Sequence, residues 1–293
     1  MTLHQQPLQL NSQLQSVLSS EAAEFLATGQ RYELPGRMIW HAWGADTAPT
    51  IVLLHGGSGS WTHWIRNIQP LVAEGYRVLA VDLPGFGDSD VPANGGDADA
   101  LVEPLHAAWQ LLRQHDNNIL MGFSFGGMTA ALWLAQYPQD AQTLVMVGAP
   151  GFGLASPKRI PLKGWRHLAT EALQAQAHRH NLMGLMLHDE ANLDEVAMRL
   201  HVLNVVRDRM TRRRLSSTPV LVEAMPKIKC PVHVIYGEFD AFYLDRLPEV
   251  ETMFKQVTPN LVLWQLVKGM GHWVQYENPT GFHRALKHTL SLV

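Results

Sequence analysis

One serine of this 293-residue chain lies in a pattern typical of an enzymatic nucleophile. Ser124 is the central residue of Gly-Phe-Ser-Phe-Gly, residues 122–126, which fits the motif Gly-x-Ser-x-Gly. The apolar residues 119–122 predict a buried strand, and residues 126–137 predict a helix that ends before Pro138. Glycines beside the serine allow strand and helix to approach closely through a sharp turn. We therefore expect this turn to present Ser124 as a nucleophile.

A serine hydroxyl is a weak nucleophile at neutral pH, so it needs a general base and a group that orients this base. His272 follows the last predicted strand, and Asp240 closes Tyr-Gly-Glu-Phe-Asp directly after another one. In open α/β sheets, ligands bind beyond the carboxyl ends of the strands, and all three residues lie at such ends. The sequence therefore predicts a catalytic triad of Ser124, His272 and Asp240, with Glu238 as the competing acid.

A glycine-rich turn, residues 55–60, follows the predicted strand 51–54 and reads His-Gly-Gly-Ser-Gly-Ser. Acyl transfer places negative charge on the former carbonyl oxygen, and two backbone N–H groups usually stabilise it. We expect one N–H from Phe125 and the other from Gly57, with Ser58 as the alternative. A phosphate-binding loop is the other interpretation of these glycines. Neither Gly-Lys-Ser/Thr nor Gly-x-Gly-x-x-Gly is present, so nucleotide binding is not expected.

The elements that would position these residues alternate between short apolar strands and amphipathic, helix-length segments. Strands that are apolar throughout are typical of a sheet covered on both faces, and strand–helix alternation favours parallel strands. The sequence therefore predicts an α/β protein with a mainly parallel sheet and an antiparallel edge. The predicted strands are 31–34, 38–43, 51–54, 77–81, 119–122, 144–147, 232–236 and 261–266; the predicted helices include 61–74, 97–114, 126–137, 244–257 and 279–291.

A long interval between the strands 144–147 and 232–236 has no clear strand, although a crossover needs only about a dozen residues. Its pattern is helical over 165–179, 182–188 and 193–210, and it is rich in methionine, which suits either an adaptable pocket wall or an ordinary helix core. We predict a helical cap here. The predicted organisation is an N-terminal extension over residues 1–29 with a helix over 14–26, an α/β core over 30–151 and 218–293, and a cap over 152–217.

Composition excludes several classes of protein. Apolar residues make up 46% of the chain and charged residues 17%, which is incompatible with global disorder. The formal net charge is −3, whereas nucleic-acid-binding proteins usually carry a strong positive excess. The single cysteine, Cys230, rules out an intramolecular disulfide and any multi-cysteine metal site, and the 15 histidines are scattered. We therefore expect no metal, no cofactor and no nucleic-acid partner.

The sequence also bears on membrane contact and location. Residues 119–135 carry no charge, but a spanning helix needs about 20 predominantly apolar residues, and glycines interrupt this run. The start of the chain is polar and rich in glutamine, without the basic and apolar segments of a secretory signal. We expect a cytoplasmic protein with no membrane contact, for which a homo-oligomer is compatible with the sequence.

Five motifs, in this order, resemble the α/β-hydrolase superfamily over about residues 31–290. They are His55-Gly-Gly, the sequence Asp-Leu-Pro-Gly-Phe-Gly-Asp-Ser over 82–89, the turn around Ser124, Gly-Glu-Phe-Asp over 237–240, and Gly271-His272. The resemblance implies an eight-stranded, mostly parallel sheet, a cap inserted after the sixth strand, and a Ser-His-Asp triad. Haloalkane dehalogenases and many epoxide hydrolases of this superfamily carry Asp at the turn, and Ser124 argues against both.

Within the superfamily, His-Trp-Val-Gln-Tyr-Glu over 272–277 resembles the meta-cleavage-product hydrolases, which split carbon–carbon bonds of ring-fission dienoates. Those enzymes usually carry Trp after the catalytic His, as here, and tend to carry Asn where this chain has Phe123. They use a cap arginine for the substrate carboxylate. Candidates in this chain are Arg166, Arg199, Arg207 and Arg209. The arginine-rich run 207–214 is more typical of a solvated helix end.

Together these features predict a serine hydrolase that cleaves a small to medium acyl substrate, most simply a carboxylic ester, through an acyl-enzyme intermediate. Ser58, Phe123 and Trp273 are the expected substrate contacts. His55 is expected to hydrogen-bond local backbone, and Cys230 to be structural. A carbon–carbon bond hydrolase is the main alternative. A cofactor-free haloperoxidase-like enzyme and a non-catalytic ligand receptor are the other two.

Overall fold

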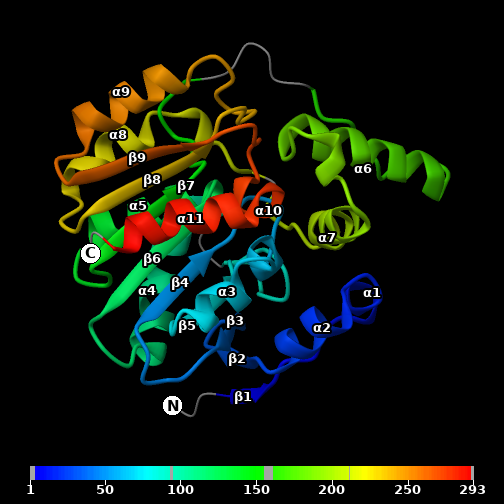
Figure 1. Cartoon of the computed structure of the whole chain (residues 1–293), viewed down its shortest axis with the longest axis horizontal. Coiled ribbons are helices and arrows are strands. Elements are labelled where there is room, and N and C mark those ends of the chain that lie inside the picture. The colour runs from blue at the N-terminus through cyan, green and yellow to red at the C-terminus, as the bar shows by residue number, and fades with distance from the viewer. Residues whose placement is uncertain (1–3, 93–94, 155–160, 211, 292–293) are drawn as a thin grey trace.

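The structure is a computed structural model, and it describes residues 4–92, 95–154, 161–210 and 212–291. A nine-stranded sheet runs through the molecule, with helices on both of its faces (Figure 1). The strand order is β1-β2-β3-β5-β4-β6-β7-β8-β9. The strands are β1 (His4–Pro7), β2 (Gln30–Leu34), β3 (Met38–Trp43), β4 (Thr50–Leu54), β5 (Arg77–Asp82), β6 (Asn118–Phe123), β7 (Thr143–Val147), β8 (Val232–Gly237) and β9 (Leu261–Val267).

Neighbouring strands from β5 to β9 pair in parallel, whereas β1, β2 and β3 extend the sheet in antiparallel fashion at one edge. This confirms the predicted α/β class and its mainly parallel sheet. The expected number of eight strands is wrong, because β1 adds a ninth from the residues assigned to the N-terminal extension. Its four residues are polar or proline and exposed, so they show no apolar alternation, and pairing with β2 holds them in the sheet.

Eleven α-helices lie among the described residues. They are α1 (Ser12–Gln15), α2 (Ser20–Ala27), α3 (Ile68–Ala73), α4 (Val102–Leu112), α5 (Phe125–Gln136), α6 (Glu171–Leu185), α7 (Glu195–Val206), α8 (Val220–Ala224), α9 (Leu247–Val257), α10 (Val274–Glu277) and α11 (Pro279–Leu290). The single helix expected over 14–26 is in fact the two helices α1 and α2. Ser19 separates them, because its Oγ accepts a hydrogen bond from the N–H of Ala22 and so begins α2.

Two apolar clusters form the core, one on each face of the sheet. Successive residues of β4 point to opposite faces of the sheet and so belong to different clusters. Val52 packs in the cluster that includes residues of α4, α5, α8 and α9, whereas Ile51 packs in the cluster that includes residues of α3 and α11. Buried positions therefore lie on both faces of the central strands, as their continuous apolar sequences predict.

Helices α6 and α7 belong to the interval predicted as a cap, and in Figure 1 they stand together at one end of the molecule, away from the helices that cover the sheet. Residues 155–160 and 211 of this interval lie outside the described residues, as do 1–3 of the predicted extension and 292–293 of the core. Among the described residues, no helix is long and apolar enough to cross a membrane.

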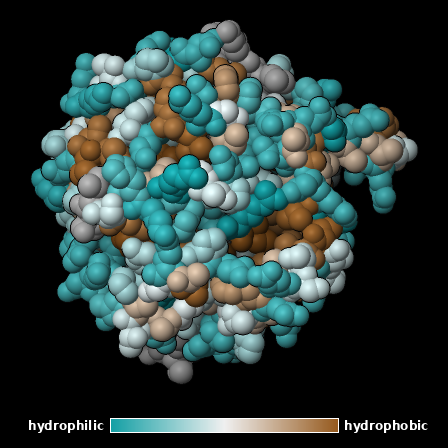
Figure 2. Space-filling view, viewed as in Figure 1, coloured by the Kyte–Doolittle hydropathy of each residue, from teal (hydrophilic) through white to brown (hydrophobic). Residues whose placement is uncertain are grey.

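Figure 2 shows a largely polar face with an apolar hollow (brown). A groove of about 560 Å³ lies where α2, α3 and α7 meet, with Leu18, Ala22, Ile65 and Val196 among its lining residues.

Candidate active site

Ser124 lies on a sharp turn between β6 and α5. Its backbone has φ 51° and ψ −116°, a conformation that a residue other than glycine rarely adopts. The Ser124 N–H donates to the carbonyl of Val147 in the neighbouring strand β7 at 2.7 Å, which holds the turn. A Cβ on Gly126 would lie 2.4 Å from the Leu54 carbonyl oxygen, and one on Gly122 would lie 2.3 Å from that of Gly126. The two glycines are therefore a steric requirement of this turn.

Asp240 and His272 follow the ends of β8 and β9, and their side chains are hydrogen-bonded. Nδ1 of His272 lies 2.7 Å from Oδ2 of Asp240, and both residues are buried. Oδ1 of Asp240 accepts the N–H of Phe242 at 2.9 Å, which orients the carboxylate. The competing acid, Glu238, is exposed and accepts the N–H of Gly269 instead. Of the two acids, the structure brings Asp240 to the histidine.

Ser124 and His272 line one cavity of about 240 Å³. The expected contacts Ser58 and Phe123 and both expected oxyanion donors also lie on its wall, whereas Trp273 does not. Trp273 is buried, and its Nε1–H donates to the carbonyl of His63 at 2.9 Å. The lining residues are Gly56, Gly57, Ser58, Phe123, Ser124, Phe125, Pro150, Leu162, Leu185, Met186, Arg213, Ser216, Phe242 and His272.

The turn after β4 contributes Gly56, Gly57 and Ser58 to the cavity wall. The N–H of Gly56 donates to Nδ1 of His63 at 3.2 Å. Among the hydrogen bonds of the described residues, none uses the N–H of Gly57 or of Phe125. Ser58, also in the left-handed region at φ 51°, donates its hydroxyl to Oδ2 of Asp208 at 2.5 Å. Gly57 and Phe125 thus carry unused donors on the wall shared with Ser124.

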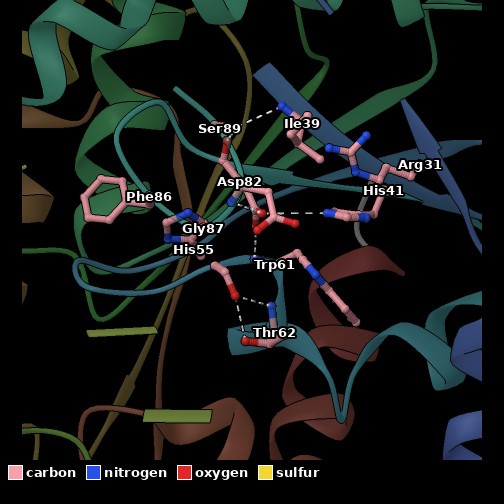
Figure 3. Close-up of polar contacts among 12 residues, drawn as sticks. Arg31, Ile39, His41, His55, Trp61, Thr62, Asp82, Phe86, Gly87 and Ser89 are labelled. Atoms are coloured by element: carbon pink, nitrogen blue, oxygen red, sulfur yellow. Dashed lines mark hydrogen bonds and ion pairs between the residues drawn. The ribbon is translucent and has the colours of Figure 1, made fainter. Parts of the chain in front are cut away.

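His55 and Asp82, both drawn in Figure 3, make hydrogen bonds to the turn that follows β4 and to the loop that follows β5. His55 Nδ1 contacts the Gly56 carbonyl at 2.7 Å, and its Nε2 accepts the Leu83 N–H at 2.9 Å, in keeping with the local backbone role expected for it. Burial lowers the pKa of His55 to about 4, so this ring is neutral at pH 7. Neutrality leaves Nε2 free to act as the acceptor.

Asp82 is the residue from the 82–89 motif whose role only the structure reveals. Its carboxylate accepts the N–H of Trp61 and of Asp88, each at 2.9 Å, and lies 3.8 Å from Nε2 of His41 (Figure 3). Burial raises the pKa of Asp82, but the contact with His41 and the Asp88 N–H outweigh it, so the pKa is lowered overall. An ionised Asp82 therefore ties the turn that follows β4 to the loop that follows β5.

Arg213 is the arginine at the cavity, and the candidates Arg166, Arg199, Arg207 and Arg209 are absent from its wall. Arg207 pairs with Asp88, Arg209 donates to the Gly87 carbonyl, and Arg166 donates to that of Val205. Arg213 belongs to the run 207–214, for which the sequence favours a solvated helix end; that expectation is wrong for Arg213, which lines the cavity with its side chain 23% exposed. The run has five arginines in close succession, and the sequence carries no signal that distinguishes the one facing the cavity.

Cys230 is buried, and burial raises the pKa of its thiol to about 11. The thiol is therefore protonated at neutral pH and unsuited to nucleophilic attack. No cluster of three or more His, Cys, Asp or Glu residues that could hold a metal occurs in the described parts of the chain.

Comparisons with known proteins agree with this fold. Residues 49–218 match the family model described as alpha/beta hydrolase fold. A 2-hydroxy-6-oxononadienedioate/2-hydroxy-6-oxononatrienedioate hydrolase of Cupriavidus pinatubonensis is 29% identical, over 81% of this chain and 85% of its own length. A hydrolase of the same name from Escherichia coli K12 is 26% identical, over 83% of this chain and 87% of its own length.

Solved structures are similar at lower identity. A carboxylesterase from Bacillus subtilis superimposes with a TM-score of 0.74 at 20% identity, over 92% of this chain and 94% of its own. A putative aryl esterase from Burkholderia cenocepacia superimposes with a TM-score of 0.71 at 22% identity, over 90% of this chain and 98% of its own. The family match covers more than half of the chain, and the sheet order and the turn at Ser124 accord with it. The chain therefore belongs to the α/β-hydrolase fold family.

Proposed function

We propose that this α/β hydrolase is a serine hydrolase that cleaves carboxylic esters with small to medium acyl groups. The observation that carries the proposal is the 2.7 Å contact between His272 Nδ1 and Asp240 Oδ2, beside a cavity whose wall includes both His272 and Ser124. A buried carboxylate on Nδ1 selects the tautomer whose Nε2 can accept a proton. That tautomer is the one a general base for serine requires.

In the proposed mechanism, Ser124 Oγ attacks the ester carbonyl while His272 Nε2 takes its proton. His272 then gives this proton to the leaving alcohol, and the acyl group stays on Ser124. Asp240 holds the imidazole and stabilises its cation. The N–H groups of Gly57 and Phe125 hold the negative oxygen of the tetrahedral intermediate. Water, activated by His272, attacks the acyl-enzyme and releases the acid.

The apolar side chains on the cavity wall favour a substrate with an acyl chain. Phe123, Phe125 and Phe242 from the core are joined by Leu185 and Met186 from the interval 152–217. We infer that this interval acts as a cap that closes the acyl-binding pocket. Met186 is then part of the pocket wall, a place that its flexible and polarisable side chain suits.

A fluorescent fluorophosphonate tests the proposal, because it reacts with an activated serine and forms a stable adduct. We expect wild-type protein to take up one label and to hydrolyse p-nitrophenyl butyrate. Ser124→Ala should do neither while keeping its circular dichroism spectrum. Ser217→Ala, at an exposed serine outside the cavity wall, is the matched control and should label normally. Labelling that persists in Ser124→Ala, or its absence from the wild type, would refute the proposal.

A carbon–carbon bond hydrolase is the second candidate, and the names of the relatives at 26–29% identity favour it. It would use the same Ser124 and His272 and would also need a cation for a substrate carboxylate. Parallel assays with a ring-fission dienoate and with p-nitrophenyl butyrate separate the two. We expect the larger kcat/KM with the ester, and the reverse order would favour the second candidate.

A further inference from the structure

Arg213 places a guanidinium on the wall of the proposed acyl pocket. An arginine there would ordinarily bind a substrate carboxylate through two parallel N–H···O hydrogen bonds, since its planar fork matches a carboxylate. In this chain a residue of the protein already occupies that fork. Nη1 donates to Oδ1 of Asp208 at 2.8 Å and Nη2 donates to Oδ2 at 2.9 Å.

The pair is partly buried, with 23% of the Arg213 side chain and 13% of the Asp208 side chain exposed. Burial raises the pKa of Asp208, but Arg213 and the Ser58 hydroxyl outweigh it and lower the pKa overall. The carboxylate is therefore ionised at neutral pH. The two charges cancel at the cavity wall.

Several further contacts hold this arrangement in place. Asp208 accepts the Ser58 hydroxyl at 2.5 Å and the Met210 N–H at 2.9 Å. The Arg213 guanidinium lies over the Phe86 ring, with its carbon 5.0 Å from the ring centre, and 5.7 Å from the centre of Phe125. A substrate carboxylate would have to displace Asp208 from Arg213, Ser58 and the Met210 N–H, or lie beside its negative charge in a partly dehydrated site. Both alternatives are unfavourable.

We propose that Asp208 determines acyl specificity by neutralising Arg213, so that the pocket accepts uncharged acyl groups and rejects acyl groups that carry a carboxylate. This inference rests on the proposed esterase function and names its substrate class. The remaining wall agrees with it, because Phe123, Leu185 and Phe242 supply apolar surface to an acyl chain.

Two p-nitrophenyl esters of equal shape test the proposal. One is the mono-p-nitrophenyl ester of adipic acid, whose chain ends in a carboxylate. The other is p-nitrophenyl 6-methylheptanoate, in which an isopropyl group replaces that carboxylate. A six-carbon diacid is chosen because, in the monoesters of shorter diacids, the free carboxylate attacks the ester carbonyl of the same molecule. The corresponding pair of esters from suberic acid tests a longer distance between the ester carbonyl and the terminal carboxylate. The measured quantity is the ratio of kcat/KM for the acidic ester to that for the neutral ester.

We expect wild-type protein to prefer the neutral ester, with a ratio below about one tenth. Asp208→Asn should raise the ratio by on the order of tenfold or more, because it frees a guanidinium to make charge-assisted hydrogen bonds with the acidic substrate. The double variant Asp208→Asn with Arg213→Gln should lose this gain. Damage to the neighbouring turn would slow both esters alike and leave the ratio unchanged, so the ratio separates specificity from a structural role.

Asp88→Asn is the matched control, because Asp88 pairs with Arg207 at 2.9 Å away from the cavity wall. It should leave the ratio at the wild-type value. A wild-type ratio of one or more, or an unchanged ratio in folded Asp208→Asn with both ester pairs, would overturn the proposal. If Asp208→Asn does not fold, Asp208→Ser takes its place. A wild-type protein that hydrolyses neither ester and takes up no fluorophosphonate marks failure of the proposed function instead.

Discussion

Asn204 in helix α7 and Ser60 on the turn after β4 are joined by a buried hydrogen bond, in which the Ser60 hydroxyl donates to Oδ1 of Asn204 at 2.8 Å. Nδ2 of Asn204 donates to the Thr62 hydroxyl at 3.1 Å, and all three residues are at most 3% exposed. These bonds tie the predicted cap to the turn that carries Gly57. We infer that seating of α7 helps to set the position of the Gly57 N–H.

Replacing Asn204 by Leu should therefore weaken both stability and turnover. The change removes two buried hydrogen bonds, and we expect the free energy of unfolding to fall by about 1–3 kcal/mol. Because the turn loses its tether, kcat for p-nitrophenyl butyrate should fall more than KM rises. Urea unfolding and steady-state kinetics measure the two effects. Gln176→Leu, at an exposed position on α6, is the control, and equal effects in both variants would contradict the role of Asn204.

Asp240→Asn should lower kcat by on the order of 10³- to 10⁴-fold with little change in fold, because the amide no longer selects the His272 tautomer that accepts a proton. Glu238→Gln removes the nearby acid that contacts Gly269 instead. It should retain most of the activity. Ester hydrolysis and fluorophosphonate labelling rates measure both variants. A larger loss in Glu238→Gln than in Asp240→Asn would reverse the assignment of the acid.

Gly126→Ala should abolish labelling of Ser124 and destabilise the protein. The added Cβ would lie 2.4 Å from the Leu54 carbonyl oxygen and 2.5 Å from that of His55, and both are backbone atoms of a central strand and its end. Gly96→Ala is the matched control, because its Cβ would meet Arg212 only at 3.7 Å. Thermal unfolding distinguishes the two variants. Wild-type stability in Gly126→Ala would show that the turn has another conformation.

Stability should fall as the pH is lowered from about 6.5 to 4. Burial lowers the pKa of His55 from 6.5 to about 4, so between these values the unfolded chain binds a proton that the folded protein does not. The contribution of His55 is complete above pH 6.5 and amounts to about 3 kcal/mol. His55→Gln should reduce the slope of unfolding free energy against pH in this window. It should not abolish the slope, because burial also lowers the pKa of His201 to about 4.

His4→Gln, at an exposed position, is the control for this measurement and should leave the slope unchanged. Urea unfolding at half-unit pH intervals provides the data. An equal slope in wild type and His55→Gln would show that the His55 ring titrates alike in both states.

The expectations that were confirmed concern patterns read over short stretches of chain. The turn at Ser124 could be predicted because its glycines, the strand β6 and the helix α5 are contiguous in sequence, and steric clashes at Gly126 leave little choice of residue. Continuous apolar runs likewise predicted buried parallel strands. The strand β1 escaped prediction because its exposed polar residues gain their structure from pairing with β2.

The residues that the sequence could not assign depend on contacts between distant segments. Asp208 and Ser58 are 150 positions apart in the chain and hydrogen-bonded in the fold. Arg213, which follows α7 in the chain, lines the same cavity as Gly57 and Ser124, which are distant from it in sequence. By itself, the sequence determined the fold class and the sharp turn between strand and helix at Ser124, since both follow from neighbouring residues. Only the tertiary structure decided which arginine faces the cavity and that Asp208 neutralises it, because long-range packing sets where a side chain points.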